Sequence, residues 1–84
     1  MAARQGSWEK AHDERYRKLI DLLVAERKKL GLSQQALANR LGHHQQFVSR
    51  YETYQRRLDV VEFVDVIRSL DLKMEQLIAF IDLQ

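Results

Sequence analysis

The 84-residue sequence contains no cysteine, no proline, only three glycines and no long apolar run. Without cysteine it can form neither a disulfide framework nor a thiolate metal site, which fits a reducing compartment. No segment approaches the roughly 18 apolar residues of a bilayer-spanning helix, and the N-terminus lacks the apolar stretch of a signal peptide. These absences predict a soluble, cytoplasmic protein without a membrane partner.

The sequence also lacks the usual signatures of catalysis. It has no glycine-rich phosphate loop and no nucleophile, histidine and carboxylate at a recognisable spacing. The pair His43-His44 suggests a metal site, but adjacent side chains on a helix point about 100° apart, and no third ligand has suitable spacing. We therefore expect no enzymatic activity, no cofactor and no metal.

The size of the chain allows a single domain. A domain this short buries only roughly 60–65% of the surface that its unfolded chain exposes, so its stability is small. A second copy would add buried surface, and we expect a homodimer.

The net charge of +2 is unevenly distributed along the chain. Residues 1–57 carry twelve Lys and Arg against six Asp and Glu, whereas residues 58–84 carry two against six. The two parts therefore have charges of +6 and −4. A basic segment can face a polyanion such as DNA, although a run of charge alone can also be an ordinary solvated surface.

Apolar periodicity predicts an all-α fold of five helices. Residues 1–11 show no period and are interpreted as a flexible N-terminal tail, in which Trp8 either packs on the first helix or belongs to an arm that orders on binding. Residues 12–84 form the domain. Its first helix begins near His12 and ends at Gly31, after two lysines in the last turn.

The remaining helices are marked by capping residues. Ser33 begins a short helix over about 33–41 that ends at Gly42, and a further short helix follows over about 44–53. Asp59 opens the fourth helix, with Glu62 at capping-box spacing, and a fifth runs from about residue 74 to 83.

Two short helices joined by a glycine-containing turn are typical of a helix-turn-helix. The second of them, the recognition helix, fits the major groove, which is about 12 Å wide. Val48 and Tyr51 are expected to point into the core, whereas the opposite face is polar and either reads base edges or is simply solvated. That face consists of Gln45, Gln46, Ser49 and Arg50.

Two segments, separated in the sequence by only a few residues, carry a family resemblance. They are Gly31-Leu32-Ser33-Gln34-Gln35-Ala36-Leu37-Ala38 with Leu41-Gly42, and Val48-Ser49-Arg50-Tyr51-Glu52. Together they resemble the Cro/C1-type (XRE) helix-turn-helix family of bacterial and phage transcriptional regulators, over about residues 27–77. The segment 56–63, Arg-Arg-Leu-Asp-Val-Val-Glu-Phe, resembles a common subgroup of these regulators.

The resemblance implies a lambda-repressor-like five-helix domain that binds double-stranded DNA. It implies that Gln34 binds a phosphate and braces Gln45, and that Arg27 pairs with Glu52 as a structural ion pair. The implied base readers are Gln45, Gln46, Ser49 and Arg50, and the implied phosphate contacts include His43, His44, Arg56 and Arg57.

The sequence departs from the family pattern at three places. Thr53 and Tyr54 replace an Asn-Gly turn, so either Tyr54 is left-handed or the recognition helix runs longer. His43 and His44 replace a small or hydroxyl-bearing start of that helix. The start of the fifth helix is uncertain, because Asp71 and Lys73 stand where Gly and Ser would be expected.

The fifth predicted helix is more apolar than one inward stripe requires. Leu77 is expected to pack inside the domain, whereas Ile78, Phe80 and Leu83 are assigned to a two-fold interface. The predicted function is thus that of a homodimeric transcriptional regulator, in the simplest case a repressor on a palindromic operator. Two alternatives remain: an antitoxin-like autoregulator that also binds a partner protein, and a helix-turn-helix used for protein contacts only.

Overall fold

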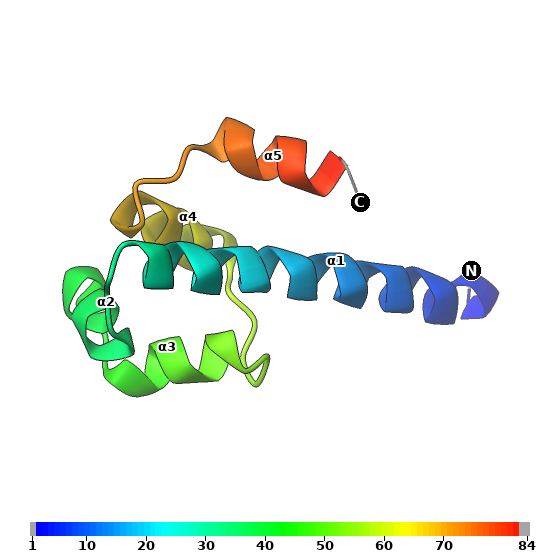
Figure 1. Cartoon of the computed structure of the whole chain (residues 1–84). Coiled ribbons are helices and arrows are strands. Elements are labelled where there is room, and N and C mark those ends of the chain that lie inside the picture. Colours follow the sequence, from blue (N-terminus) through cyan, green and yellow to red (C-terminus); the bar gives the residue numbers. More distant parts are fainter. Residues whose placement is uncertain (1, 83–84) are drawn as a thin grey trace.

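The protein is described by a computed structural model that covers the backbone of residues 2–82 and the side chains of residues 14–82. Within these residues the chain forms five helices and no strand, as the all-α prediction required. The helices are α1 (Ala2–Lys29), α2 (Gln34–Leu41), α3 (Gln45–Glu52), α4 (Val60–Ser69) and α5 (Met74–Asp82) (Figure 1).

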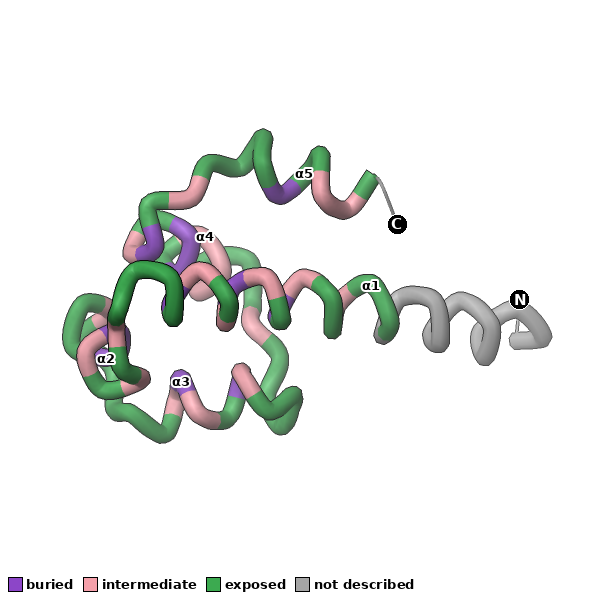
Figure 2. The backbone as a smooth tube through the Cα atoms, viewed as in Figure 1, coloured by how far each residue is buried: buried purple, intermediate pink, exposed green. Residues whose placement is uncertain are grey.

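The long helix α1 forms the centre of the arrangement. It contacts α3 on one side and α5 on the other, while α2 packs against both α3 and α4 (Figure 1). All five helices turn buried residues inward (Figure 2). The core consists of Ile20, Leu23, Leu37, Ala38, Val48, Tyr51, Val66, Ile67, Leu70 and Leu77.

The predicted capping residues set the boundaries of the short helices. The Ser33 hydroxyl accepts the backbone N–H of Ala36 at 3.0 Å, and Gly42 ends α2 with a φ of 71°. The Asp59 side chain accepts the backbone N–H of Glu62 at 2.7 Å, and the Glu62 side chain accepts that of Asp59 at 3.0 Å. This capping box fixes the start of α4.

Helix α1 begins earlier than the sequence analysis predicted. Its backbone is helical from Ala2, not from about His12, so the backbone over residues 2–11 does not have the irregular form expected of a tail. This segment holds no proline and is rich in Ala, Arg, Gln, Glu and Lys, which favour helix even where apolar periodicity is missing. The side chain of Trp8, and hence both predicted roles for it, lies outside the described residues.

Among the described residues, two non-glycine residues have positive φ angles, and they lie at the end of α3 and before the start of α5. Tyr54 has a φ of 63°, and α3 ends at Glu52, so the chain leaves α3 through a left-handed tyrosine and not through a longer helix. Asp71 has a φ of 57° in the place of the expected glycine. At the start of α5, the Lys73 backbone N–H donates to Gln76 Oε1 at 2.8 Å, which is the bond that the N3 side chain makes in a capping box.

No helix in the described part of the chain is both long enough and apolar enough to span a bilayer.

Candidate nucleic-acid interface

Helix α3 divides its side chains between the core and the surface. Val48 and Tyr51 are fully buried, as predicted. Gln45, Gln46 and Arg50 are exposed on the outside, and Ser49, the fourth predicted base reader, is half-buried. The helix therefore offers two glutamines and an arginine to a ligand along its outer side.

An ion pair between Arg27 and Glu52 holds the C-terminal end of α3. Arg27 Nε donates to Glu52 Oε2 at 2.6 Å and Arg27 Nη2 donates to Glu52 Oε1 at 3.0 Å, so the pair is bidentate. The two side chains are 9% and 5% exposed. Arg27 Nη1 also donates to the backbone oxygen of Leu32 at 2.7 Å, which ties the turn after α1 into the same contact. The hydrogen bond to Glu52 raises the pKa of Arg27, which keeps the guanidinium charged.

Gln34 links this ion pair to the outer face of α3. Its Nε2 donates to Glu52 Oε1 at 2.9 Å, and its Oε1 lies 3.4 Å from the Nε2 of Gln45, which is a long hydrogen bond. The structure thus brings Gln34 and Gln45 together. Gln34 is also the first residue of α2, where unpaired backbone N–H groups favour an anion.

His43 and His44 lie at the turn between α2 and α3. His44 is the N-cap residue of α3, but its side chain makes no capping hydrogen bond. The His43 ring is stacked on the Phe47 ring, with centroids 4.0 Å apart and an interplanar angle of 12°. Both histidines are exposed, close to the N-terminal end of α3, where the resemblance placed phosphate contacts.

Arg56 is already engaged by a carboxylate. Its two terminal nitrogens donate to Glu62 Oε1 and Oε2 at 2.8 and 2.7 Å, and its guanidinium carbon lies 5.0 Å from the centroid of the Phe47 ring. Together with the backbone N–H of Asp59, Arg56 lowers the pKa of Glu62 to about 2. The sequence reasoning assigned Glu62 to the capping box alone and missed this pair, which depends on the path of the loop.

The sequence reasoning also missed a cluster beyond the C-terminal end of α3. The Tyr54 hydroxyl donates to Asp21 of α1, and the guanidinium carbon of Arg17 lies 4.7 Å from the centroid of the Tyr54 ring. Arg57, a predicted phosphate contact, is exposed, and its guanidinium carbon lies 4.5 Å from the Tyr16 ring centroid. The only signal in the sequence was the replacement of the expected glycine by Tyr54.

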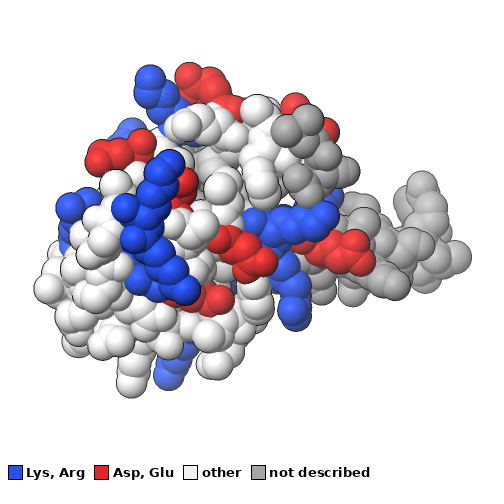
Figure 3. Space-filling model, in the orientation of Figure 1, with Lys and Arg blue, Asp and Glu red and all other residues white. Residues whose placement is uncertain are grey.

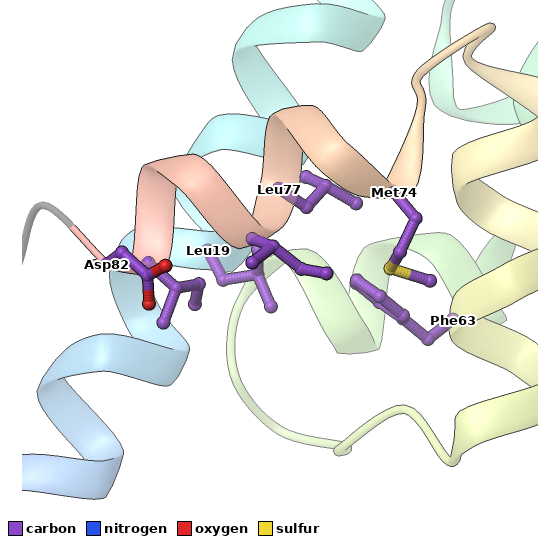
Figure 4. Close-up of a pocket in the computed structure, with 7 residues that line it drawn as sticks. Leu19, Phe63, Met74, Leu77 and Asp82 are labelled. Atoms are coloured by element: carbon purple, nitrogen blue, oxygen red, sulfur yellow. The ribbon is translucent and has the colours of Figure 1, made fainter.

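The predicted interface residues of α5 differ in exposure. Ile78 is 55% exposed, Phe80 is half-buried, and Leu83 lies outside the described residues. Beside Ile78, a groove of about 240 Å³ lies between α1, α4 and α5 (Figure 4). The groove is lined by Leu19, Phe63, Met74, Leu77, Ile78, Ile81 and Asp82. Met74, which the sequence analysis did not select, is 39% exposed and extends this apolar surface.

Charges of both signs share the molecular surface. On the face shown in Figure 3, Lys and Arg side chains lie beside Asp and Glu side chains. The region occupied by α2 and α3 is largely uncharged in this view. Among residues 14–82, no group of three or more His, Asp or Glu side chains is arranged to hold a metal ion.

Comparisons with known proteins agree with this geometry. A family model described as Helix-turn-helix matches residues 23–77. The fold is similar to the solved structure of an XRE-family like protein from Pseudomonas syringae pv. tomato str. DC3000, with a TM-score of 0.86 and 38% sequence identity. That similarity covers 93% of this chain and 95% of the other. A comparison with curated protein sequences found no significant match.

Proposed function

Because the chain belongs to the Cro/C1-type (XRE) helix-turn-helix family of DNA-binding regulators, we propose that it is a sequence-specific transcriptional regulator that binds a palindromic operator as a homodimer. The observation that carries the proposal is the division of α3. Its inner residues are fixed by the core and by the Arg27–Glu52 pair, while Gln45, Gln46 and Arg50 remain exposed. A rigid helix with long polar side chains on one face meets the requirement of major-groove reading.

The exposed side chains of α3 define which bases the protein would read. A glutamine amide can bind adenine through two hydrogen bonds, and an arginine can bind guanine in the same way. Each such contact discriminates against the wrong base by about 1–3 kcal/mol. Ser49, which is half-buried, would contact a base only through its small hydroxyl group.

The phosphate contacts lie around this face. Gln34 at the start of α2 and the histidines 43 and 44 flank the N-terminal end of α3, and the arginines 56 and 57 follow its C-terminal end. Such contacts fix the position of a protein on the duplex without reading sequence. Arg56 would reach a phosphate only by exchanging or sharing its bond with Glu62.

The apolar surface of α5 supports a second copy as the partner. Ile78 and Met74 are exposed beside the groove, and burial of such side chains drives association. A two-fold dimer would place two copies of α3 about 34 Å apart, one turn of B-DNA. Such a dimer would repress transcription by covering a promoter. We place the protein in the cytoplasm, bound to DNA, and assign it no catalytic activity and no cofactor.

The proposal is tested by fluorescence anisotropy with random duplex DNA and with DNA from upstream of the gene, across a salt series. A regulator of its own promoter would bind the upstream DNA at least about a thousandfold more tightly than random DNA. Its affinity would fall steeply as salt rises. No binding below about 100 μM at low salt would contradict DNA binding and favour a helix-turn-helix used only for protein contacts.

Arg50→Ala tests the assignment of the reading face once an operator is known. We expect it to weaken operator binding by about 1–3 kcal/mol and to relax the preference at one base pair per half-site. Arg68→Ala is the matched control, because Arg68 is an exposed arginine near the end of α4 and lies outside the predicted reading face. Equal effects of the two substitutions would show that Arg50 contributes charge only.

A further inference from the structure

A small polar hollow lies between α1 and the loop that follows α3. Its volume is about 120 Å³, and its lining consists of two tyrosines and two arginines: Tyr16, Arg17, Tyr54 and Arg57. Among the residues with described side chains, no carboxylate belongs to this lining. This volume is well above the roughly 10–15 Å³ that one enclosed water molecule requires, so the hollow can admit a small oxyanion.

Both arginines of the hollow are positioned by aromatic rings. Arg17 lies over the ring of Tyr54 and Arg57 lies over the ring of Tyr16. A guanidinium that rests on a ring loses conformational freedom. The two cations therefore line the hollow with restricted geometry.

The rings themselves are held in place. The Tyr16 hydroxyl accepts the backbone N–H of Leu58 at 3.1 Å, and the Tyr54 hydroxyl donates to Asp21. Asp21, the acceptor of the Tyr54 hydroxyl, does not line the hollow. The hydroxyl contacts thus connect the loop to α1 at two points.

Tyr54 occupies this place at the expense of backbone strain. Its φ of 63° lies in the left-handed region, which glycine adopts without steric conflict. Non-glycine residues persist in this region where their surroundings determine the conformation, and they cluster at functional sites. A glycine would complete the turn equally well, but it would leave Arg17 without its ring.

The position of the hollow relative to α3 suggests its ligand. The eight residues of α3 span about 12 Å at 1.5 Å per residue, which equals the approximate width of the major groove. When the N-terminal residues of α3 meet base edges, the loop beyond its C-terminal end lies close to a phosphate backbone at the edge of the groove. Tyr54 is the second residue after α3 ends.

We propose that this hollow binds a phosphate group of the DNA backbone, and that Arg17 of α1 joins Arg57 in holding it. The proposal rests on the proposed DNA-binding function and adds to it a contact from outside the helix-turn-helix. Two guanidinium groups supply several N–H donors to one phosphate, and arginine is suited to such multiple hydrogen bonding. The contact is independent of base sequence.

The test compares Arg17→Gln with Arg68→Gln in binding to random duplex DNA over a salt series. Both substitutions remove one positive charge from an exposed position, but only the first changes the hollow. For Arg17→Gln, we expect the slope of log K against log[salt] to become less steep by about 0.9, the value of one phosphate contact. This change corresponds to about eightfold weaker binding at about 0.1 M salt. Arg68→Gln should leave the slope unchanged.

Nuclear magnetic resonance of the wild-type protein gives a second readout that does not depend on the folding of a variant. The Arg17 side-chain Nε–H signal should shift on addition of random duplex DNA, and Arg17→Lys should fail to restore full affinity, because lysine does not stack in the same way. Equal slopes for the two glutamine variants would overturn the proposal, and so would an Arg17 signal that does not shift.

Three outcomes separate this inference from the proposed function on which it rests. Saturation of the Arg17 shift by inorganic phosphate alone, with an unchanged DNA slope in Arg17→Gln, would identify a free-anion site and overturn the DNA assignment. A wild-type protein that binds no DNA at low salt would refute the proposed function itself. Wild-type binding with an unaffected slope in Arg17→Gln would refute only the role of the hollow.

Discussion

Replacing Arg27 with methionine is expected to destabilise the domain strongly, because it removes the cation from a nearly buried ion pair. Glu52, whose side chain is 5% exposed, would keep one hydrogen bond from Gln34 and would lose two from Arg27. An uncompensated buried charge of this kind costs about 3–5 kcal/mol. Each kcal/mol shifts the melting temperature of a 60–100-residue domain by about 4–8 °C, so the expected decrease is at least about 12 °C.

Urea and thermal unfolding followed by circular dichroism would measure this effect in a double-mutant cycle. Glu52→Leu alone should also be costly, whereas Arg27→Met combined with Glu52→Leu should cost less than the sum of the single changes, because no charge is left buried. Lys28→Met is the matched control on an exposed neighbouring position and should change stability by less than about 0.5 kcal/mol. The reasoning would be refuted by single changes that cost under about 1 kcal/mol and add together without coupling.

Three further predictions concern the loop after α3 and the surface of α5. The pKa of Glu62 is lowered from 4.5 to about 2, so its bond to Arg56 stabilises the fold above pH 4.5 and is lost as pH falls from 4.5 to 2. Glu62→Gln should therefore reduce the dependence of the urea midpoint on pH in this range. An identical pH dependence in the wild-type protein and the variant would contradict the pairing. In urea unfolding, the Tyr54→Gly variant should be more stable than the Tyr54→Ala variant by about 1 kcal/mol, since both substitutions remove the ring but only glycine relieves the left-handed strain. Equal stability of the two variants would argue against a positive φ at this position. Ile78→Glu should convert a dimer into a monomer in analytical ultracentrifugation without loss of helicity, and a wild-type monomer at tens of micromolar protein would remove α5 as the interface.

The helices after α1 were predictable because residues at or next to their ends determine where they begin and end. Ser33, Gly42 and Asp59 all stand at helix boundaries and act there through their own side chains or backbone conformation. The side of α3 that faces the core was also predictable, from the apolar residues Val48 and Tyr51, which are buried. Capping and periodicity depend on residues within one turn of one another, so a single sequence is sufficient to detect them.

The start of α1 and the contacts of the loop could not be predicted in the same way. The first residues of α1 are helical without an apolar stripe, so periodicity did not detect them. The bond from Arg56 to Glu62 and the contact of Arg17 with Tyr54 join different elements through a loop. Their geometry depends on the left-handed conformation of Tyr54, for which the sequence left two alternatives.

On the proposed function, α3 carries residues for folding and residues for recognition along one short helix. Val48, Tyr51 and Glu52 carry its attachment to the domain, through the core and through Arg27. Gln46 and Arg50 are exposed, so substitution of either residue should change the free energy of unfolding by no more than about 0.5 kcal/mol. Gln45 is the exception, because its long hydrogen bond to Gln34 connects it to the buried carboxylate of Glu52. If α3 reads bases as proposed, base preference can change at Gln46 and Arg50 independently of the fold, whereas a change at Gln45 also alters the network that holds α3 in place.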